Sequence, residues 1–181
     1  YGQLVPYYGR NMNRAGLEGY VDRLYQLCLN RKPDPAGQAD WIDRLYRGRA
    51  TGAQAAFGFF FSDEFKLWNT TDEEYVELLY NVMMGRASDT AGKADWVYKL
   101  HNGVGREGVF RGFAQSREFE MICASYGIEQ GTVSVSEARD KNFGLTTFIA
   151  RLYTRALGRT YETAGLNDWC GRILAGSWTV Y

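Results

Sequence analysis

The apolar side chains of this chain follow a helical period in three separate places. At each place four of them stand at positions i, i+3, i+4 and i+7, the spacing of one buried stripe along an α-helix. The three sets are Val21, Leu24, Tyr25 and Cys28; Val76, Leu79, Tyr80 and Met83; and Ile149, Leu152, Tyr153 and Ala156. The pattern predicts three helices with polar outer faces and with these side chains in the core.

A second helix is predicted after each stripe, beyond a short turn. Its expected inner faces are Trp41, Ile42, Leu45 and Tyr46; Trp96, Val97, Leu100 and His101; and Trp169, Cys170, Ile173 and Leu174. In the first copy a third helix follows, because Thr51 and Gln54 form a capping-box pattern, and Ser62 is expected to cap one more short turn. The sequence therefore predicts an all-α fold of tandem helical repeats, packed into a compact body or a short array.

The turn between the first and second helices repeats the same residue types at the same spacing. The three corners consist of Arg31, Asp34, Gly37, Asp40 and Trp41; Arg86, Asp89, Gly92, Asp95 and Trp96; and Arg159, Glu162, Gly165, Asp168 and Trp169. The stretch "SDEF" at 62–65 returns as "SREF" at 116–119, whereas the third copy reaches Tyr181 without one. We divide the chain into an N-terminal segment of unclear role (1–18), repeat 1 (19–74), repeat 2 (75–146, with a longer connector at 121–146) and a truncated repeat 3 (147–181).

The corner residues are expected to play structural roles. Asp34 stands where a helix N-cap belongs and Pro35 at the first helical position, and Asp89 is placed in the same way. Glu162 is a poor N-cap, so pairing of each acid with the arginine three residues earlier is a second hypothesis. The glycines are unfavourable inside a helix, which predicts a close approach of a neighbouring helix. The tryptophans are expected to anchor the second helix in the core.

These corners carry a resemblance to a known family. The Leu-Tyr pair, the arginine after Gly or Asn, the acid-x-Ala-Gly run, the Asp-Trp pair and the later "FFFSDEF" resemble the repeat called domain of unknown function 4214. The likeness covers residues 20 to 120 well and 147 to 176 in part, with Glu162 as a departure. It implies an all-helical, non-catalytic module that is secreted or displayed on a bacterial cell surface, as in exported proteins of gut and rumen Firmicutes.

Composition and charge narrow the possible partners. Lys plus Arg and Asp plus Glu each number 21, and this balance argues against a nucleic-acid interface or a basic membrane-surface patch. No apolar run approaches the ~18 residues that a membrane-spanning helix needs, so no membrane insertion is expected. The chain starts at Tyr1 without a signal peptide, as a mature form or an excised fragment would.

Residues with reactive side chains are few, and each has a structural interpretation. His101, the single histidine, is expected to be a partly buried packing residue, and one histidine weakens every His-dependent triad. Cys28 and Cys170 fall at core positions, and Cys123 is the expected free thiol. The recurring acid pairs could support glycoside hydrolysis or bind calcium, but three catalytic pairs in one chain would be unusual and no EF-hand pattern is present. We expect no enzyme activity, no cofactor and no metal.

Several aromatic residues fall outside the helical stripes. They are Tyr7, Tyr8, Trp68, Tyr126, Tyr161 and Trp178. Exposed aromatic rings can stack on sugars or anchor interfaces, although packing between the repeats is the alternative. Two functions follow as hypotheses: a module that binds a glycan or cell-wall polymer, or an assembly module that contacts other proteins or copies of itself.

Overall fold

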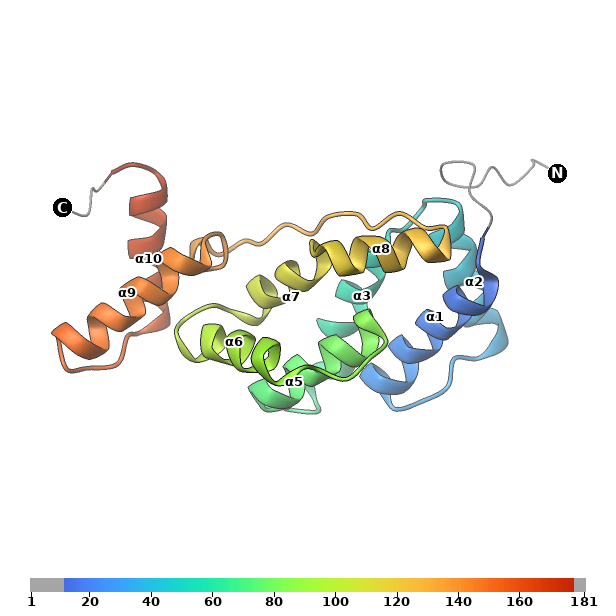
Figure 1. Ribbon diagram of the computed structural model, residues 1–181, viewed down its shortest axis with the longest axis horizontal. Coiled ribbons are helices and arrows are strands. Elements are labelled where there is room, and N and C mark those ends of the chain that lie inside the picture. The colour runs from blue at the N-terminus through green and yellow to red at the C-terminus, as the bar shows by residue number, and fades with distance from the viewer. Residues whose placement is uncertain (1–11, 178–181) are drawn as a thin grey trace. The chain divides into compact units, whose positions relative to one another are not determined.

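The structure of the protein is a computed structural model that describes residues 12–177 (Figure 1). Within these residues every regular element is helical, which confirms the predicted all-α fold. The elements are α1 (Arg14–Leu29), α2 (Pro35–Tyr46), α3 (Gly52–Phe60), α4 (Asp63–Lys66), α5 (Asp72–Leu79), the π-helical segment η2 (Tyr80–Met84), α6 (Thr90–His101), α7 (Arg106–Ala114), α8 (Arg117–Tyr126), the 3-10 turn η3 (Ala138–Asp140), α9 (Phe143–Ala156) and α10 (Thr163–Leu174).

The chain forms two compact units that cut across the sequence repeats. Within the described residues, the first unit contains 12–88 and 113–133, and the second contains 89–112 and 134–177. Repeat 2 therefore contributes to both units, and the division falls inside α7. The first turn of α1 lies in the segment 1–18, and α8 occupies the start of the stretch expected to be a connector.

The core of the first unit forms around α1. The predicted stripe of this helix is buried, and Leu17 and Tyr20 extend it by one turn toward the N-terminus. The Tyr20 hydroxyl donates a hydrogen bond to the Gly52 carbonyl of α3 at 2.9 Å, and its ring lies 6.2 Å from that of Phe119 in α8. Because α1 contacts α2, α3 and α8, its burial holds the first unit together.

The segment after α8 crosses the start of α3. The N–H groups of Gly52 and Ala53 donate to the carbonyls of Glu129 and Gln130, both at 2.8 Å. These bonds satisfy N–H groups that have no partner inside the helix. The predicted capping box of Thr51 and Gln54 is also present. This start of α3 is therefore fixed by contacts on both sides.

The second unit has a core between α9 and α10. Ile149, Ala150, Leu166 and Cys170 are buried together there. The turn η3 contacts both helices, and the Thr146 hydroxyl donates to the Arg139 carbonyl at 2.7 Å. Cys170 thus lies in the core as predicted. Cys28 and Cys123 are likewise buried and free, and Cys123 belongs to α8 rather than to a loop.

A buried carboxylate links η3 to the loop before α7. Oδ1 of Asp140 accepts a hydrogen bond from the Gly105 N–H at 2.6 Å, and the guanidinium of Arg111 donates to the Asp140 carbonyl at 2.9 Å. Burial raises the pKa of the Asp140 carboxyl above 3.8, against the opposing effects of the Gly105 N–H and of Arg139. The nearby carboxylate of Glu137 also raises the pKa of Asp140. The folded state therefore holds this proton more tightly than the unfolded chain does.

This raised pKa predicts the pH dependence of stability. The contribution of Asp140 is fully present below the unfolded pKa and is lost as pH rises through the folded pKa. Replacement of Asp140 by Asn should reduce the loss of unfolding free energy as pH rises. Urea titrations at a series of pH values between about pH 3 and about pH 7 measure this loss. An unchanged slope in Asp140→Asn would contradict the assignment.

Candidate functional site

The first helix of every repeat ends in the same way. A residue with positive φ follows it, and the N–H of the next arginine donates to the carbonyl of the repeat tyrosine, as in a left-handed helix cap. The positive-φ residues are Asn30 (50°), Gly85 (66°) and Gly158 (61°). The N–O distances are 3.4 Å for Arg31 to Tyr25, 3.5 Å for Arg86 to Tyr80 and 3.2 Å for Arg159 to Tyr153. The Tyr–Arg spacing is thus set by helix termination.

Each of these arginines also lies over the ring of its tyrosine. The guanidinium carbon is 5.1 Å from the ring centroid for Arg31, 5.0 Å for Arg86 and 5.4 Å for Arg159. This distance suits a cation–π interaction. The three corners therefore present an arginine in an equivalent position on an equivalent ring.

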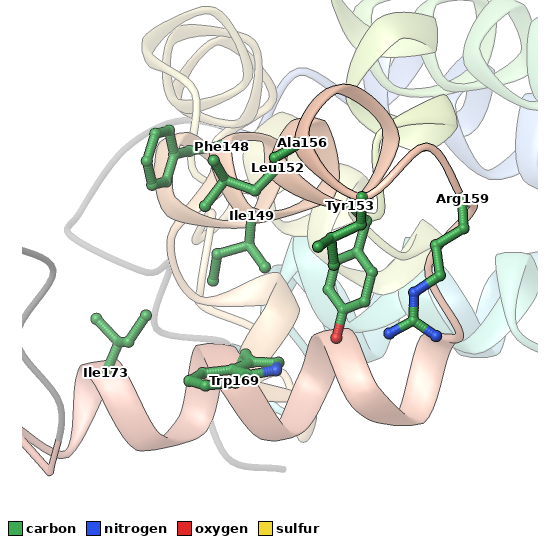
Figure 2. A pocket seen from close by; sticks show the side chains of 9 residues that line it. Phe148, Ile149, Leu152, Tyr153, Ala156, Arg159, Trp169 and Ile173 are labelled. Atoms are coloured by element: carbon green, nitrogen blue, oxygen red, sulfur yellow. The ribbon is translucent and has the colours of Figure 1, made fainter.

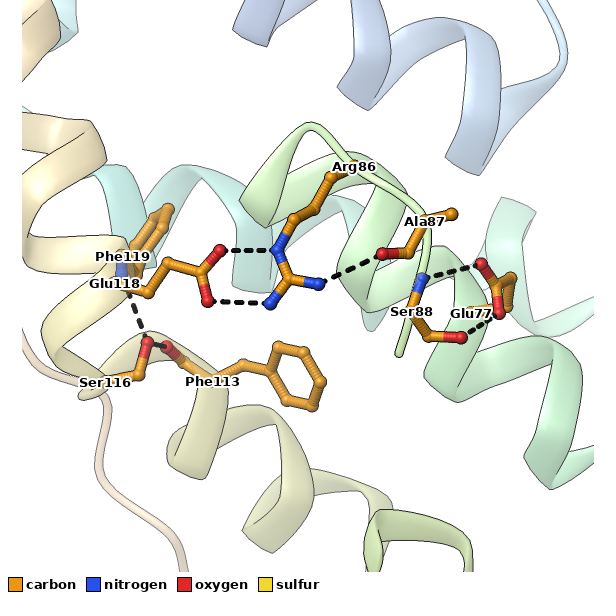
Figure 3. Close-up of polar contacts among 8 residues, drawn as sticks. All are labelled: Glu77, Arg86, Ala87, Ser88, Phe113, Ser116, Glu118 and Phe119. Atoms are coloured by element: carbon orange, nitrogen blue, oxygen red, sulfur yellow. Dashed lines mark hydrogen bonds and ion pairs between the residues drawn. The ribbon is translucent and has the colours of Figure 1, made fainter. Parts of the chain in front are cut away.

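The arginine's ion-pair partner is a glutamate far along the chain. Arg31 pairs with Glu64 at 3.3 Å, and Arg86 binds both oxygens of Glu118, at 2.7 and 2.9 Å (Figure 3). These are the glutamates of "SDEF" and "SREF". The proposed pairing of Arg31 with Asp34 is wrong, because Glu64 is the acidic group that Arg31 reaches among the residues described. Asp34, three residues after Arg31, lies at the N-terminus of α2 instead.

The other corner acids have structural roles. Asp34 and Asp89 accept hydrogen bonds from the N–H groups of Gly37 and Gly92, so the predicted N-caps are confirmed, and Glu162 makes no such side-chain cap. The remaining acids form pairs with a basic residue four positions on, which are Asp40 with Arg44, Asp95 with Lys99 and Asp168 with Arg172. Exposed pairs of this kind contribute at most about 1 kcal/mol each.

The corner glycines admit the tyrosine of the preceding helix. A Cβ on Gly37 would lie 3.2 Å from the Tyr25 hydroxyl, and one on Gly165 would lie 3.5 Å from that of Tyr153. The predicted close approach is therefore present at Gly37, whereas the contact at Gly165 is an ordinary van der Waals distance. The Gly-Tyr contact fixes how the second helix meets the first.

A third helix covers the corner in repeats 1 and 2. Phe59 of α3 lies 4.9 Å from the Tyr25 ring and 5.6 Å from that of Trp41. Phe113 of α7 lies 4.9 Å from the Tyr80 ring. The serine three residues after each Phe donates to the Phe carbonyl and caps the following helix (Figure 3). The shared pattern Gly-Phe-x-x-Ser-x-Glu-Phe thus delivers both the ring and the glutamate to the corner.

The corner of repeat 3 has no such cover within residues 12–177. A cavity of about 420 Å³ opens there (Figure 2). We call it the third-repeat groove, and its lining is Phe148, Ile149, Leu152, Tyr153, Ala156, Leu157, Arg159, Trp169 and Ile173. Trp169 is 38 % exposed, Leu152 43 % and Leu157 60 %. The predictions that Trp169 and Leu152 are core residues are wrong for this reason.

Three further predictions about inner faces are also wrong. Leu174 is exposed near the end of α10, and Ala156 is exposed at the end of α9. The side chain of His101 is exposed too, although its carbonyl accepts a hydrogen bond from the Tyr161 hydroxyl at 3.3 Å.

The aromatic residues proposed as ligand platforms differ in exposure. Tyr126 is half-buried, with its ring 6.0 Å from Tyr20 and its hydroxyl 3.1 Å from a guanidinium nitrogen of Arg23. Tyr161 packs against the α9–α10 core. These two rings are therefore packing residues. Trp68 is 41 % exposed and stacks on Phe65. The candidates Tyr7, Tyr8 and Trp178 lie outside the described residues.

The described residues carry little other chemistry. Among residues 12–177, no three His, Cys, Asp or Glu side chains gather in a way that could hold a metal ion. No helix in the same range has the length and apolar character needed to cross a bilayer. The third-repeat groove is therefore the feature of this part of the chain that most resembles a binding site.

The three capped corners define a tandem helical repeat protein. The family described as domain of unknown function (DUF4214) matches residues 7–68 and 58–123. The chain belongs to this family, and the two matches correspond to repeats 1 and 2, which carry a covered corner. Comparison with curated proteins and with solved structures found no match.

Proposed function

We propose that the protein is a non-catalytic assembly module that binds an amphipathic helix of a protein partner in the third-repeat groove. The groove is open and is lined by aliphatic and aromatic side chains with Arg159 at one end. Amphipathic helices bind such grooves by laying their apolar face into them. The observation that carries the proposal is the exposure of apolar side chains whose counterparts in the other repeats are covered by a helix.

The distribution of exposed apolar residues supports this site. Among residues 12–177, nine large hydrophobic side chains are exposed, and five of them belong to α9, α10 or the turn between them: Phe148, Leu152, Leu157, Trp169 and Leu174. Apolar side chains gathered in one place indicate an interaction surface, whereas scattered ones need no explanation. The lining is mostly apolar, with Tyr153, Arg159 and Trp169 as its hydrogen-bonding side chains, and this favours the apolar face of a helix over a polysaccharide.

The proposal is tested by binding of fluorescent amphipathic helical peptides, measured by anisotropy. We expect saturable binding that is lost in Leu152→Glu, which places a charge in the groove. The matched control is Leu67→Glu, since Leu67 is an exposed leucine outside the groove. Failure of every helical peptide to bind, or equal binding to both variants, would contradict the assembly function.

Glycan binding is a second candidate, supported by the exposed ring of Trp68 on Phe65. An exposed indole face can stack on a sugar ring. The resemblance to repeats of exported bacterial proteins supports an extracellular or cell-surface location for either function. A glycan array should give a hit that Trp68→Ala abolishes if this candidate holds, and a blank array on folded protein would count against it.

A further inference from the structure

We infer that the occupant of the third-repeat groove is the third helix of another repeat of the same kind, carrying the pattern Gly-Phe-x-x-Ser-x-Glu-Phe. The inference rests on the proposed assembly function and names the partner's chemistry. It makes repeat 3 an acceptor corner: a surface that a helix with this pattern completes in the way that α3 and α7 complete repeats 1 and 2.

The lining of the groove matches a corner whose occupant is known. A cavity of about 240 Å³ in repeat 1 is lined by Tyr25, Leu29, Arg31 and Trp41, together with residues of α3 and the serine that follows it. The third-repeat groove has Tyr153, Leu157, Arg159 and Trp169, which stand at the same four spacings along the chain. In repeat 1 the opposite wall is formed by Gly58, Phe59 and Ser62 of the pattern.

The ring contacts of Phe59 in repeat 1 indicate what the third-repeat groove can hold. Phe59 lies between two rings of repeat 1, at 4.9 Å from Tyr25 and 5.6 Å from Trp41. The equivalent rings of repeat 3, Tyr153 and Trp169, both line the open groove (Figure 2). The cavity volume of about 420 Å³ at this corner exceeds the 240 Å³ of the cavity beside Phe59. A phenylalanine side chain is therefore the group that this corner is shaped to accept.

Charge complementarity points to the same occupant. Arg31 and Arg86 each bind the glutamate of the pattern, at 3.3 Å and at 2.7 Å. Arg159 lies over the Tyr153 ring in the same way and is exposed. Among residues 12–177 it has no acidic partner. A glutamate five residues after the phenylalanine of an incoming helix would take the place of Glu64 or Glu118.

A folded second copy of this chain is a poor donor. Its own α3 and α7 are held in repeats 1 and 2, where Phe59 and Phe113 are both buried. Offering either helix to a neighbour would require one of these corners to open. The occupant is therefore a third helix that is not already held in a corner of its own.

The test uses a labelled synthetic peptide with the sequence of residues 105–120, "GREGVFRGFAQSREFE", titrated with the whole protein and followed by anisotropy. We expect saturable binding, retained in Leu67→Glu and lost in Leu152→Glu. In the peptide, Phe113→Ala should weaken binding by at least about 10-fold, as for a buried aromatic anchor. A scrambled peptide of the same composition should not bind.

The charge pair is tested by a double-mutant cycle. Glu118→Gln in the peptide and Arg159→Gln in the protein should each weaken binding by about 3-fold, the range for an exposed ion pair. The two changes together should cost no more than either alone, because they remove the same interaction. Additive losses would show that Arg159 does not bind this glutamate and would overturn its assigned role.

Three outcomes would overturn the inference. The first is binding of unrelated amphipathic helices but not of this peptide, which leaves the assembly function standing while the named partner fails. The second is failure of all helical peptides, in which case both fall. The third is a dimer in sedimentation velocity that dissociates in Leu152→Glu, which would make a second copy the occupant.

Discussion

Replacement of Phe113 by alanine is expected to lower the free energy of unfolding by about 3–5 kcal/mol. Phe113 is 2 % exposed, and its ring meets that of Tyr80 edge-to-face at 4.9 Å. Its removal deletes the apolar group that closes the second corner and leaves a cavity that the neighbouring helices fill only in part. Urea unfolding followed by circular dichroism measures the loss.

The matched control is the same substitution in the third-repeat groove. Phe148 is 36 % exposed and lines the open side of α9, so Phe148→Ala should cost about 1 kcal/mol or less. Comparable losses in the two variants would show that the corner of repeat 3 is as well packed as that of repeat 2. That result would remove the basis for an open acceptor corner.

Replacement of Gly131 by alanine is expected to destabilise the first unit by about 2–4 kcal/mol, from backbone strain together with overpacking. The φ angle at Gly131 is 73°, and an added Cβ would lie 2.0 Å from Oγ1 and 2.3 Å from Cβ of Thr51. Thr51 is the N-cap of α3 and cannot move without losing its capping box. Thermal and urea unfolding would both report the loss.

Gly158→Ala separates the two causes of that effect. Gly158 has a similar φ of 61°, but nothing lies within 4 Å of its added Cβ. Gly158→Ala should therefore lower the free energy of unfolding only through backbone strain, by about 1–2 kcal/mol. If Gly131→Ala were no worse than Gly158→Ala, the close contact between the connector and α3 would be refuted.

Most of the local structure could be predicted from the sequence. The stripe of α1, the capping box at Thr51 and the N-caps Asp34 and Asp89 are all present, because each depends on residues within about one or two helical turns. The partner of Arg31 could not be predicted in this way. Glu64 is 33 residues away, and only the packing of α3 on the corner brings it near.

The candidate site was harder to predict than the fold. Tyr126 and Tyr161 were proposed as platforms because they leave the helical stripes, yet neighbouring helices bury part of both rings. Leu152 and Trp169 follow the stripes but are exposed. A helical period indicates which side of a helix is apolar, whereas exposure depends on whether another element covers that side. The useful signal lies in repeats 1 and 2, where the pattern Gly-Phe-x-x-Ser-x-Glu-Phe follows each corner and supplies the ring that covers its tyrosine.

The most direct test of this account is an experimental structure of the protein with the peptide of residues 105–120 bound. The account predicts that the peptide's Phe113 ring lies on Tyr153 at a centroid distance close to the 4.9 Å found in repeats 1 and 2, with its Glu118 carboxylate paired to Arg159. A peptide bound elsewhere, or a phenylalanine ring outside the third-repeat groove, would contradict the claim that repeat 3 is completed by a helix of its own kind.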